Sequence, residues 1–150
     1  GELVADGVAV VCEEPPGGGP VAGLAAGLAA VPPEVARLVL LAADLPLLSA
    51  AAVRRLVDGV DGVDARDGAV YVDGAGRRQW LCGAWRPDAV RGRLAELAAS
   101  GPLAGRSLRE LFGPLSVVEV VSDAGEVPPW YDCDTPAALA EAESFYGGPE

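Results

Sequence analysis

Apolar runs alternate with glycine, proline and acidic residues along the first half of the chain, and the pattern predicts alternating strands and helices. Residues 8–11, rich in valine, predict a buried strand. Helical spacing in residues 21–30 predicts a helix that follows a glycine–proline loop. The continuous apolar run at residues 37–43 is typical of a central parallel strand buried on both faces. Ser49 is placed to cap a helix over residues 50–58.

The second half of the chain changes character. Residues 69–73 and 79–85 flank Gly74-Ala75-Gly76 and predict an antiparallel hairpin whose second arm is the more buried. Further helices are predicted at residues 88–99, 108–112 and 135–145, and a strand at residues 116–121. The whole pattern predicts one α/β domain over residues 1–150: a three-layer, open, mostly parallel sheet with helices on both faces and a hairpin insertion.

The charge balance excludes some partners and constrains others. The net charge is −11, and all eleven basic residues are arginine. Nucleic acid is therefore not expected as a partner, since Lys and Arg supply most of that affinity. A triphosphate would need local compensation by Mg²⁺, backbone N–H groups or a few arginines. No run of eighteen apolar residues lacks a charge or a proline, so no membrane span is predicted.

The three cysteines, Cys12, Cys82 and Cys133, are far apart, and there is no histidine to complete a zinc site with them. We interpret them as reduced thiols of a cytoplasmic protein, acting as small buried hydrophobic residues. The absence of histidine also excludes the Ser/His/Asp and Cys/His classes of hydrolase.

Three motifs could carry chemistry, and each has a purely structural alternative. The glycine-rich segment from Gly17 to Gly23 either forms a simple turn or lets a ligand approach the start of a helix. Asp44, at the end of an apolar run, is either a Mg²⁺ ligand or a cap of the following loop. Asp132 and Asp134 precede Thr135-Pro136, which is good chemistry for starting a helix.

These motifs occur in an order and spacing that resemble the molybdenum-cofactor guanylyltransferase type of nucleotidyltransferase. Gly19-Pro20-Val21-Ala22-Gly23 is similar to that family's Gly-Pro-Leu-Ala-Gly, and Asp44-Leu45-Pro46 is similar to its strand-borne aspartate followed by proline. The resemblance extends to three further segments, Trp80-Leu81-Cys82-Gly83-Ala84-Trp85-Arg86, Arg106-Ser107-Leu108-Arg109-Glu110-Leu111 and Asp132-Cys133-Asp134-Thr135-Pro136. The five segments are spread over nearly the whole length of the chain.

The resemblance implies a Rossmann-like nucleotidyltransferase fold and a Mg²⁺-dependent reaction. In that reaction GMP passes from GTP to the phosphate of molybdopterin, and pyrophosphate is released. By the same resemblance Asp44 is the metal ligand and a catalytic residue, and Glu13, Gly19 and Gly23 bind the nucleotide together with it. Asp132 and Asp134 stand where the family has acceptor-binding polar residues, often Asn. Carboxylates there suit an anionic acceptor poorly.

The resemblance fails at the N-terminus. The family opens with a strand, a Leu-Ala-Gly-Gly loop and then an Arg and a Lys that hold the triphosphate, and residues 1–12 show none of these. We therefore expect an N-terminally incomplete domain with open strand edges that invite self-association. The alternatives are an incomplete form of an active enzyme, a non-catalytic interaction module, and a sister enzyme that uses CTP or another phosphorylated acceptor such as a phospholactate.

Overall fold

The computed structural model describes residues 7–45, 47–62, 66–122 and 129 of the 150-residue chain. The chain divides into two compact units. The first, Gly1–Val35 with Pro87–Pro114, is called the helical unit below, and the second, Ala36–Arg86 with Leu115–Glu150, is called the sheet unit. Each unit is described by itself. The prediction of a single domain over residues 1–150 stays a prediction.

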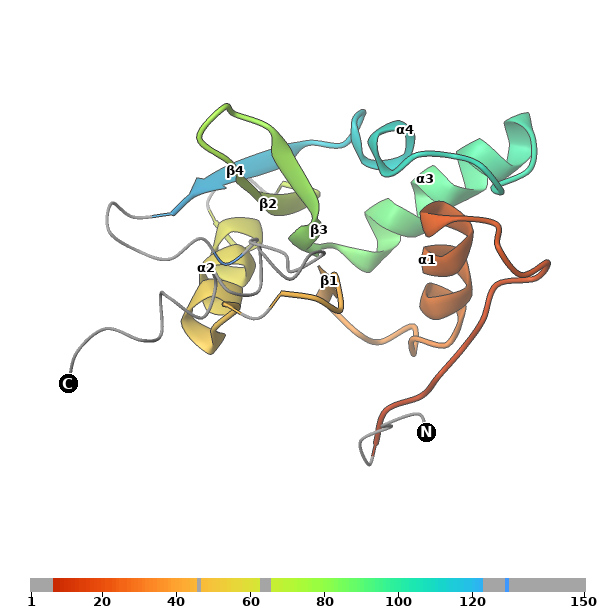
Figure 1. The fold of residues 1–150 in the computed structure, drawn as a ribbon, viewed down its shortest axis with the longest axis horizontal. Helices are drawn as coiled ribbons and strands as arrows, with labels where there is room; N and C mark the ends of the chain where they lie inside the picture. The colour runs from red at the N-terminus through yellow and green to blue at the C-terminus, as the bar shows by residue number, and fades with distance from the viewer. Residues whose placement is uncertain (1–6, 46, 63–65, 123–128, 130–150) are drawn as a thin grey trace. The chain divides into compact units, whose positions relative to one another are not determined.

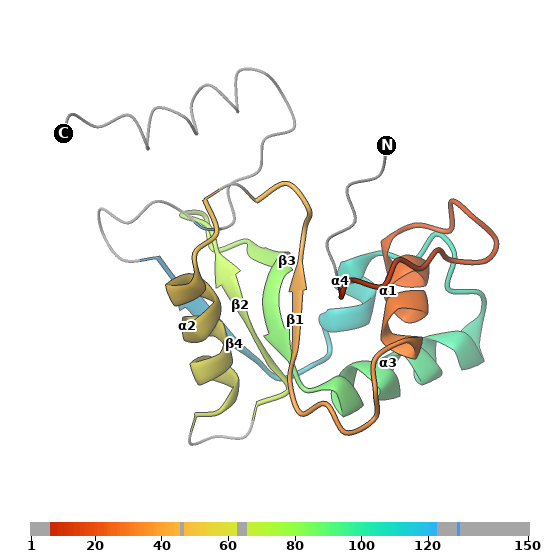
Figure 2. The same cartoon turned by 90° about the horizontal axis from the view of Figure 1, so that it is seen from below.

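The sheet unit contains a four-stranded open sheet in the order β1-β3-β2-β4 (Figure 2). Its strands are β1 (Leu38–Leu41), β2 (Gly68–Val72), β3 (Arg78–Trp85) and β4 (Val117–Val121). Both β1 and β2 pair antiparallel with β3, whereas β2 and β4 pair in parallel. Three strands therefore run in one direction and β3 opposes them. The predicted α/β fold with an open sheet and an antiparallel hairpin is confirmed.

Helix α2 (Ala50–Val60) packs on one face of this sheet (Figure 1). Ser49 caps it as predicted, since the Ser49 hydroxyl accepts a hydrogen bond from the Ala52 N–H at 3.1 Å. One turn apart, Ala52, Leu56 and Val60 are buried and pack against alternate residues of β2 and β3. The Tyr71 hydroxyl donates to the Ala52 carbonyl oxygen at 3.0 Å, which satisfies the polar end of a fully buried ring.

Two glycines make room for the indole ring of Trp85 in the sheet. Gly68 pairs with Trp85 across the β2–β3 ladder, and a Cβ atom on Gly68 would lie 2.2 Å from Trp85 Cε3. A Cβ atom on Gly83 would lie 2.8 Å from the Val70 side chain and 3.0 Å from Trp85 Nε1. Any larger residue would collide with the ring or with Val70. These close contacts explain why β2 begins with a glycine and β3 contains one.

Arginines of the sheet unit bind backbone carbonyl groups. Arg86 donates to the Arg66 oxygen at 2.9 Å and to the Val60 oxygen at 3.2 Å, which ties the end of β3 to the end of α2. Arg55 on α2 donates to the Val121 oxygen of β4 at 2.9 Å. Long cationic side chains thus connect the helix to the strands that it covers.

The helical unit comprises α1 (Pro20–Ala29), α3 (Pro87–Ser100) and α4 (Leu108–Phe112), close to the predicted bounds. Their apolar faces supply the buried residues Val21, Leu28, Val90, Leu94, Leu97, Leu111 and Phe112. Arg93 on α3 donates to the Leu111 and Glu110 carbonyl oxygens at 3.0 and 2.8 Å. A cation at the carbonyl end of α4 is the favourable arrangement for a helix dipole. In the described part of the chain, no helix is both long enough and apolar enough to cross a membrane.

Three expectations about strands and burial are wrong. Residues 8–11 form no strand, and the Val8 and Val10 side chains are 58% and 61% exposed, because no described strand pairs with them. β1 is an edge strand of the described sheet and pairs antiparallel, so Leu41 is 37% exposed rather than buried on both faces. In the hairpin, β2 is buried throughout whereas Leu81 of β3 is 39% exposed, because β1 pairs only with the second half of β3. The helix predicted at residues 135–145 lies outside the described residues.

The approach of Gly68 to Trp85 predicts a large and local effect on stability. Gly68→Ala should destabilise the protein by about 1–3 kcal/mol, because the added methyl group cannot fit beside the ring. Gly74→Ala, in the hairpin loop of the same unit, is the control: its Cβ atom would meet nothing within 4 Å. That change should stay within about 0.5 kcal/mol. Urea unfolding followed by tryptophan fluorescence measures both, and equal midpoints for the two variants would contradict the packing described here.

Candidate functional site

The loop that precedes α1 depends on glycines with unusual backbone angles. Gly17 has φ +81°, and Gly19, the N-cap of α1, has φ +91° and ψ −174°. The Gly19 conformation is one that essentially only glycine adopts. Between them, Gly18 is buried, and a Cβ atom there would lie 2.9 Å from the Ala22 Cβ atom. Gly17–Gly19 is called the glycine loop below.

Glu13 closes the glycine loop from its N-terminal side. A Glu13 carboxylate oxygen accepts a hydrogen bond from the Gly17 N–H at 3.0 Å. The pKa of Glu13 is lowered by hydrogen bonds to its carboxylate from its own backbone N–H first, and then from Gly17 and Gly18. Glu13 is therefore a charged residue at neutral pH that orders the loop, and its carboxylate is partly occupied by backbone donors.

The start of α1 presents backbone donors beside the glycine loop. The Gly19 carbonyl accepts the helical hydrogen bond from the Gly23 N–H at 3.0 Å. Pro20, at the first helical position, has no N–H group, and the i−4 partners of Val21 and Ala22 lie before the helix. The partial positive charge of this end favours an anion or a polar ligand.

A cavity of about 400 Å³ adjoins the glycine loop within the helical unit. Three kinds of wall enclose it: the acidic segment before the loop, small residues of α1, and the connector between α3 and α4. The lining residues are Glu13, Glu14, Pro15, Gly18, Ala22, Ala25, Ala26, Pro102, Leu103 and Ala104. The small alanine side chains and the absence of a side chain at Gly18 keep the cavity open, and the carboxylates of Glu13 and Glu14 lie at one side of it. Such a space could accept a planar, hydrogen-bonding group.

The predicted residues are distributed over both units. Glu13, Gly19 and Gly23 lie together at the start of α1, although a Cβ atom on Gly23 would meet nothing within 4 Å, so close packing does not require glycine there. Asp44 lies in the sheet unit, exposed, in a turn shortly after β1. The resemblance implies that Asp44 and Gly19 bind the same nucleotide, and this stays a prediction because the two residues belong to different units.

Of the residues predicted to bind the metal or the acceptor substrate, Asp44 is the one that lies within the described ranges. Asp132 and Asp134 lie outside the described residues. Within the described ranges, no group of three or more Cys, Asp or Glu side chains is close enough to hold a metal ion by itself. The Asp44 carboxylate has no hydrogen bond or ion pair to any other described residue, so it could serve as one ligand among several.

Two features of the site were missed by the sequence analysis. Gly18, rather than Gly23, is the buried glycine with no room for a side chain, and the run Gly17-Gly18-Gly19 does not reveal which member is confined. Within the connector between α3 and α4 (residues 101–107), Pro102–Ala104 forms a wall of the cavity, although this segment is distant in sequence from the glycine loop. The neighbouring segment that begins at Arg106 resembles the family, but the resemblance gives that segment no role in the site.

Comparisons with known proteins agree with this architecture. The family model of the MobA-like NTP transferase domain matches residues 2–123. A solved molybdopterin-guanine dinucleotide biosynthesis protein A from Archaeoglobus fulgidus has a TM-score of 0.64 and 19% identity, over 85% of this chain and 63% of that chain. A 4-diphosphocytidyl-2C-methyl-D-erythritol synthase from Anaerococcus prevotii has a TM-score of 0.58 and 11% identity, over 84% and 65% of the two chains. The search of curated proteins finds no match.

These likenesses show a shared fold. The chain spans less than two thirds of the length of both solved relatives. The described part nevertheless includes the glycine loop, the turn that carries Asp44, and the hairpin.

Protonation of Glu13 should be visible at Gly17. Because the pKa of Glu13 is lower in the folded state, its hydrogen bond contributes stability above the ordinary glutamate pKa of about 4.3. That contribution is lost as the pH falls through the lower folded value. An NMR titration should show the Gly17 amide shift following the Glu13 carboxyl group, with a midpoint below the ordinary value. The Glu13→Gln variant should abolish this titration of Gly17. A midpoint at or above the ordinary value would contradict the assigned hydrogen bond.

The two glycines at the start of α1 should respond oppositely to alanine. Gly19→Ala should cost about 1–3 kcal/mol of stability, because a side chain strains the backbone at φ +91°. Gly23→Ala should stabilise the helix by about 0.5–1 kcal/mol, since its Cβ atom enters open space. Chemical unfolding followed by circular dichroism compares the pair. Equal effects of the two substitutions would show that the strained Gly19 conformation is not maintained in solution.

Proposed function

Because the chain belongs to the MobA-like NTP transferase domain family, we propose that the whole protein is a nucleotidyltransferase that moves GMP from GTP to the phosphate of molybdopterin. The name of the Archaeoglobus relative, which refers to molybdopterin-guanine dinucleotide, supports this choice of nucleotide and acceptor. In the reaction, an oxygen of the acceptor phosphate attacks the α-phosphorus of GTP, and the bond to the β-phosphate oxygen breaks. Pyrophosphate is the leaving group.

The observation that carries the proposal is the glycine loop and the start of α1. At Gly19, the N-cap of α1, no side chain covers the backbone, so a ligand can approach it closely. The N-terminus of the helix makes this surface electropositive. The cavity beside it offers small walls on α1 and acceptor oxygens on Glu13. Amino and ring N–H groups of a base could donate to such oxygens, while backbone N–H groups could donate to its carbonyl or to ribose. We therefore assign Glu13, Gly19 and Gly23 to nucleotide binding.

Asp44 is the residue that we assign to the metal. Its carboxylate is exposed, near the C-terminal end of β1, and not engaged by another described side chain. Mg²⁺ is bound in proteins by one or two carboxylates together with substrate phosphates, so a single free carboxylate fits this role. When bound, Mg²⁺ would supply neutralisation of the charge that develops as pyrophosphate departs. Charge compensation is needed because the protein itself carries a net charge of −11.

The acceptor would be bound by the segment that contains Asp132 and Asp134, by resemblance to the family. Two carboxylates facing an anionic acceptor would require a cation or a protonated group between them. We further propose a cytoplasmic location, in keeping with the free thiols of Cys12 and Cys82, the latter buried and with its pKa raised to about 11 by burial.

A second choice of nucleotide is favoured by one finding. The similarity in fold extends to the diphosphocytidyl-methylerythritol synthase from Anaerococcus prevotii, whose name describes a cytidine-containing product. CTP with a phosphorylated acceptor is therefore the alternative to GTP. The test is to incubate the whole protein and Mg²⁺ with molybdopterin and each of GTP, CTP, ATP and UTP in turn. We expect pyrophosphate release and a guanine dinucleotide, detected by mass spectrometry. A cytidine product would replace the first assignment, and no product with any triphosphate would contradict both.

The role of Asp44 predicts a large loss of turnover without loss of structure. Asp44→Asn in the whole protein should reduce Mg²⁺-dependent kcat/KM by about a hundredfold or more, because the neutral amide is a poor ligand for a hard cation. Asp58→Asn, an exposed carboxylate on α2, is the matched control and should retain near-normal turnover. Circular dichroism should show the same fold for both variants. Near-normal activity of Asp44→Asn would reject the metal assignment.

A further inference from the structure

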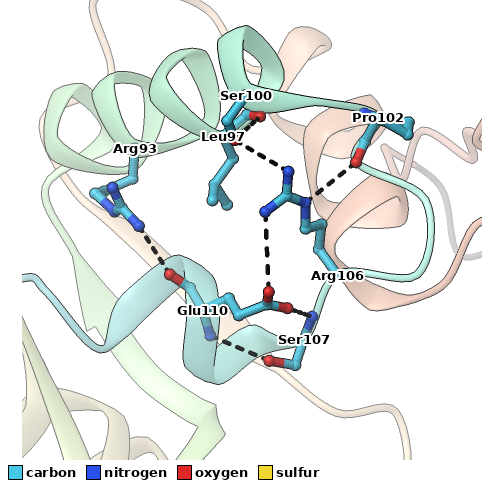
Figure 3. Close-up of polar contacts among 7 residues, drawn as sticks. All are labelled: Arg93, Leu97, Ser100, Pro102, Arg106, Ser107 and Glu110. Carbon is cyan, nitrogen blue, oxygen red and sulfur yellow. Dashed lines mark hydrogen bonds and ion pairs between the residues drawn. The ribbon is translucent and has the colours of Figure 1, made fainter.

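The connector between α3 and α4 is held by the side chain of Arg106 (Figure 3). Arg106 Nη2 donates to the Ser100 hydroxyl at 3.0 Å, and Nε donates to the Pro102 carbonyl oxygen at 3.2 Å. On the other side, Nη1 lies 3.9 Å from a carboxylate oxygen of Glu110. The rigid fork of the guanidinium group thus binds the end of α3, the connector and α4 at the same time.

Glu110 is itself fixed by the start of α4 (Figure 3). Its carboxylate accepts a hydrogen bond from the Ser107 N–H at 2.6 Å, and its own N–H donates to the Ser107 hydroxyl at 3.1 Å. This reciprocal pair is a capping box. The pKa of Glu110 is lowered by these Ser107 hydrogen bonds first and by the charge of Arg106 as well. The Glu110 carboxylate is therefore charged at neutral pH, and its hydrogen bonds with Ser107 hold it in a fixed position facing Arg106.

The connector in turn holds the glycine loop. The Gly105 N–H donates to the Gly18 carbonyl oxygen at 2.9 Å, and Gly105 has φ +78°. A turn positions it, since the Arg106 N–H donates to the Leu103 carbonyl oxygen at 3.2 Å. The Ala104 methyl group is 3.6 Å from where a Gly18 Cβ atom would be. Gly18 is thus confined by the connector on one side and by α1 on the other.

We propose that Arg106 is a positioning residue for nucleotide binding. It fixes the connector so that Gly105 holds Gly18, and this sets the direction of Gly19 and of the first turn of α1. The connector also supplies the cavity wall formed by Pro102–Ala104, so its position determines the width of the cavity. The inference rests on the proposed function, because it assigns the consequence of this arrangement to nucleotide affinity.

A direct role in binding a phosphate is the competing explanation for any effect of Arg106. The two roles differ in how they depend on Ser100. If Arg106 acts through the connector, removal of the Ser100 hydroxyl loosens the same structure and weakens nucleotide binding in the same direction. If Arg106 binds phosphate itself, the Ser100 hydroxyl does no more than orient the guanidinium group, and Gly105 exchange in Ser100→Ala stays at the wild-type rate.

The experiment compares Arg106→Gln and Ser100→Ala with Arg109→Gln in the whole protein. Arg109 lies on α4, three residues further on, and its exposed side chain makes no hydrogen bond or ion pair with the described residues. Arg106→Gln should accelerate hydrogen exchange of the Gly105 amide, measured by NMR, by about tenfold, since it removes charge-assisted hydrogen bonds. The KM for the triphosphate should rise by about tenfold with kcat changed by less than about twofold.

Ser100→Ala should accelerate Gly105 amide exchange and raise the KM for the triphosphate, each by a smaller factor than Arg106→Gln does. Arg109→Gln should change neither quantity. Ser100→Ala also carries the test if Arg106→Gln does not fold. Unchanged Gly105 exchange in Arg106→Gln overturns the inference, as does faster exchange with an unchanged KM. A raised KM in Arg106→Gln alone, with Ser100→Ala at wild-type values, assigns direct phosphate binding instead. A wild-type protein without any nucleotide transfer overturns the proposed function. Wild-type turnover together with unchanged Gly105 exchange, an unchanged KM, or a KM effect confined to Arg106→Gln overturns this inference alone.

Discussion

The backbone hydrogen bond between Gly105 and Gly18 joins two segments that are distant in sequence and lie beside one cavity. Neither segment forms a helix or a strand where the two meet, so this hydrogen bond and the backbone angles of the glycines determine how the two segments are placed. Gly18 has no room for a side chain, and Gly19 and Gly105 both have positive φ. The start of α1 therefore depends on contacts outside its own sequence. The site is best regarded as a pair of loops fixed to each other, with a helix that follows from one of them.

Arginine has a mainly structural role in this acidic protein. Arg55, Arg86, Arg91, Arg93 and Arg106 each donate to at least one backbone carbonyl oxygen. Others pair with carboxylates, as Arg78 does with Glu119. Few of the eleven arginines are left to approach a triphosphate, which is why the proposed site depends on backbone N–H groups and a divalent cation. The absence of lysine makes this dependence stronger.

The sequence predicted the elements with strong local signals. Ser49 before α2 and residues 74–76 between β2 and β3 act through neighbouring residues, so their effects could be recognised without tertiary structure. Predictions that depended on strand neighbours failed. Residues 8–11 and β1 both have apolar sequences, but no described strand pairs with residues 8–11, and β1 is an edge strand that pairs only with β3. The confinement of Gly18 and the contacts of Arg106 arise from the α3–α4 connector, and no local pattern reveals such contacts.

The arginine-to-carbonyl hydrogen bonds have a consequence for the conditions that the fold tolerates. A guanidinium group keeps its proton throughout the physiological range, and a peptide carbonyl does not titrate. The partner of the charge is a dipole at contact distance, so mobile ions screen the interaction less than they screen a pair of exposed opposite charges. The contacts that Arg55 and Arg86 make between a helix and a strand, and those that Arg93 makes between two helices, should therefore be insensitive to changes in cellular acidity and ionic strength.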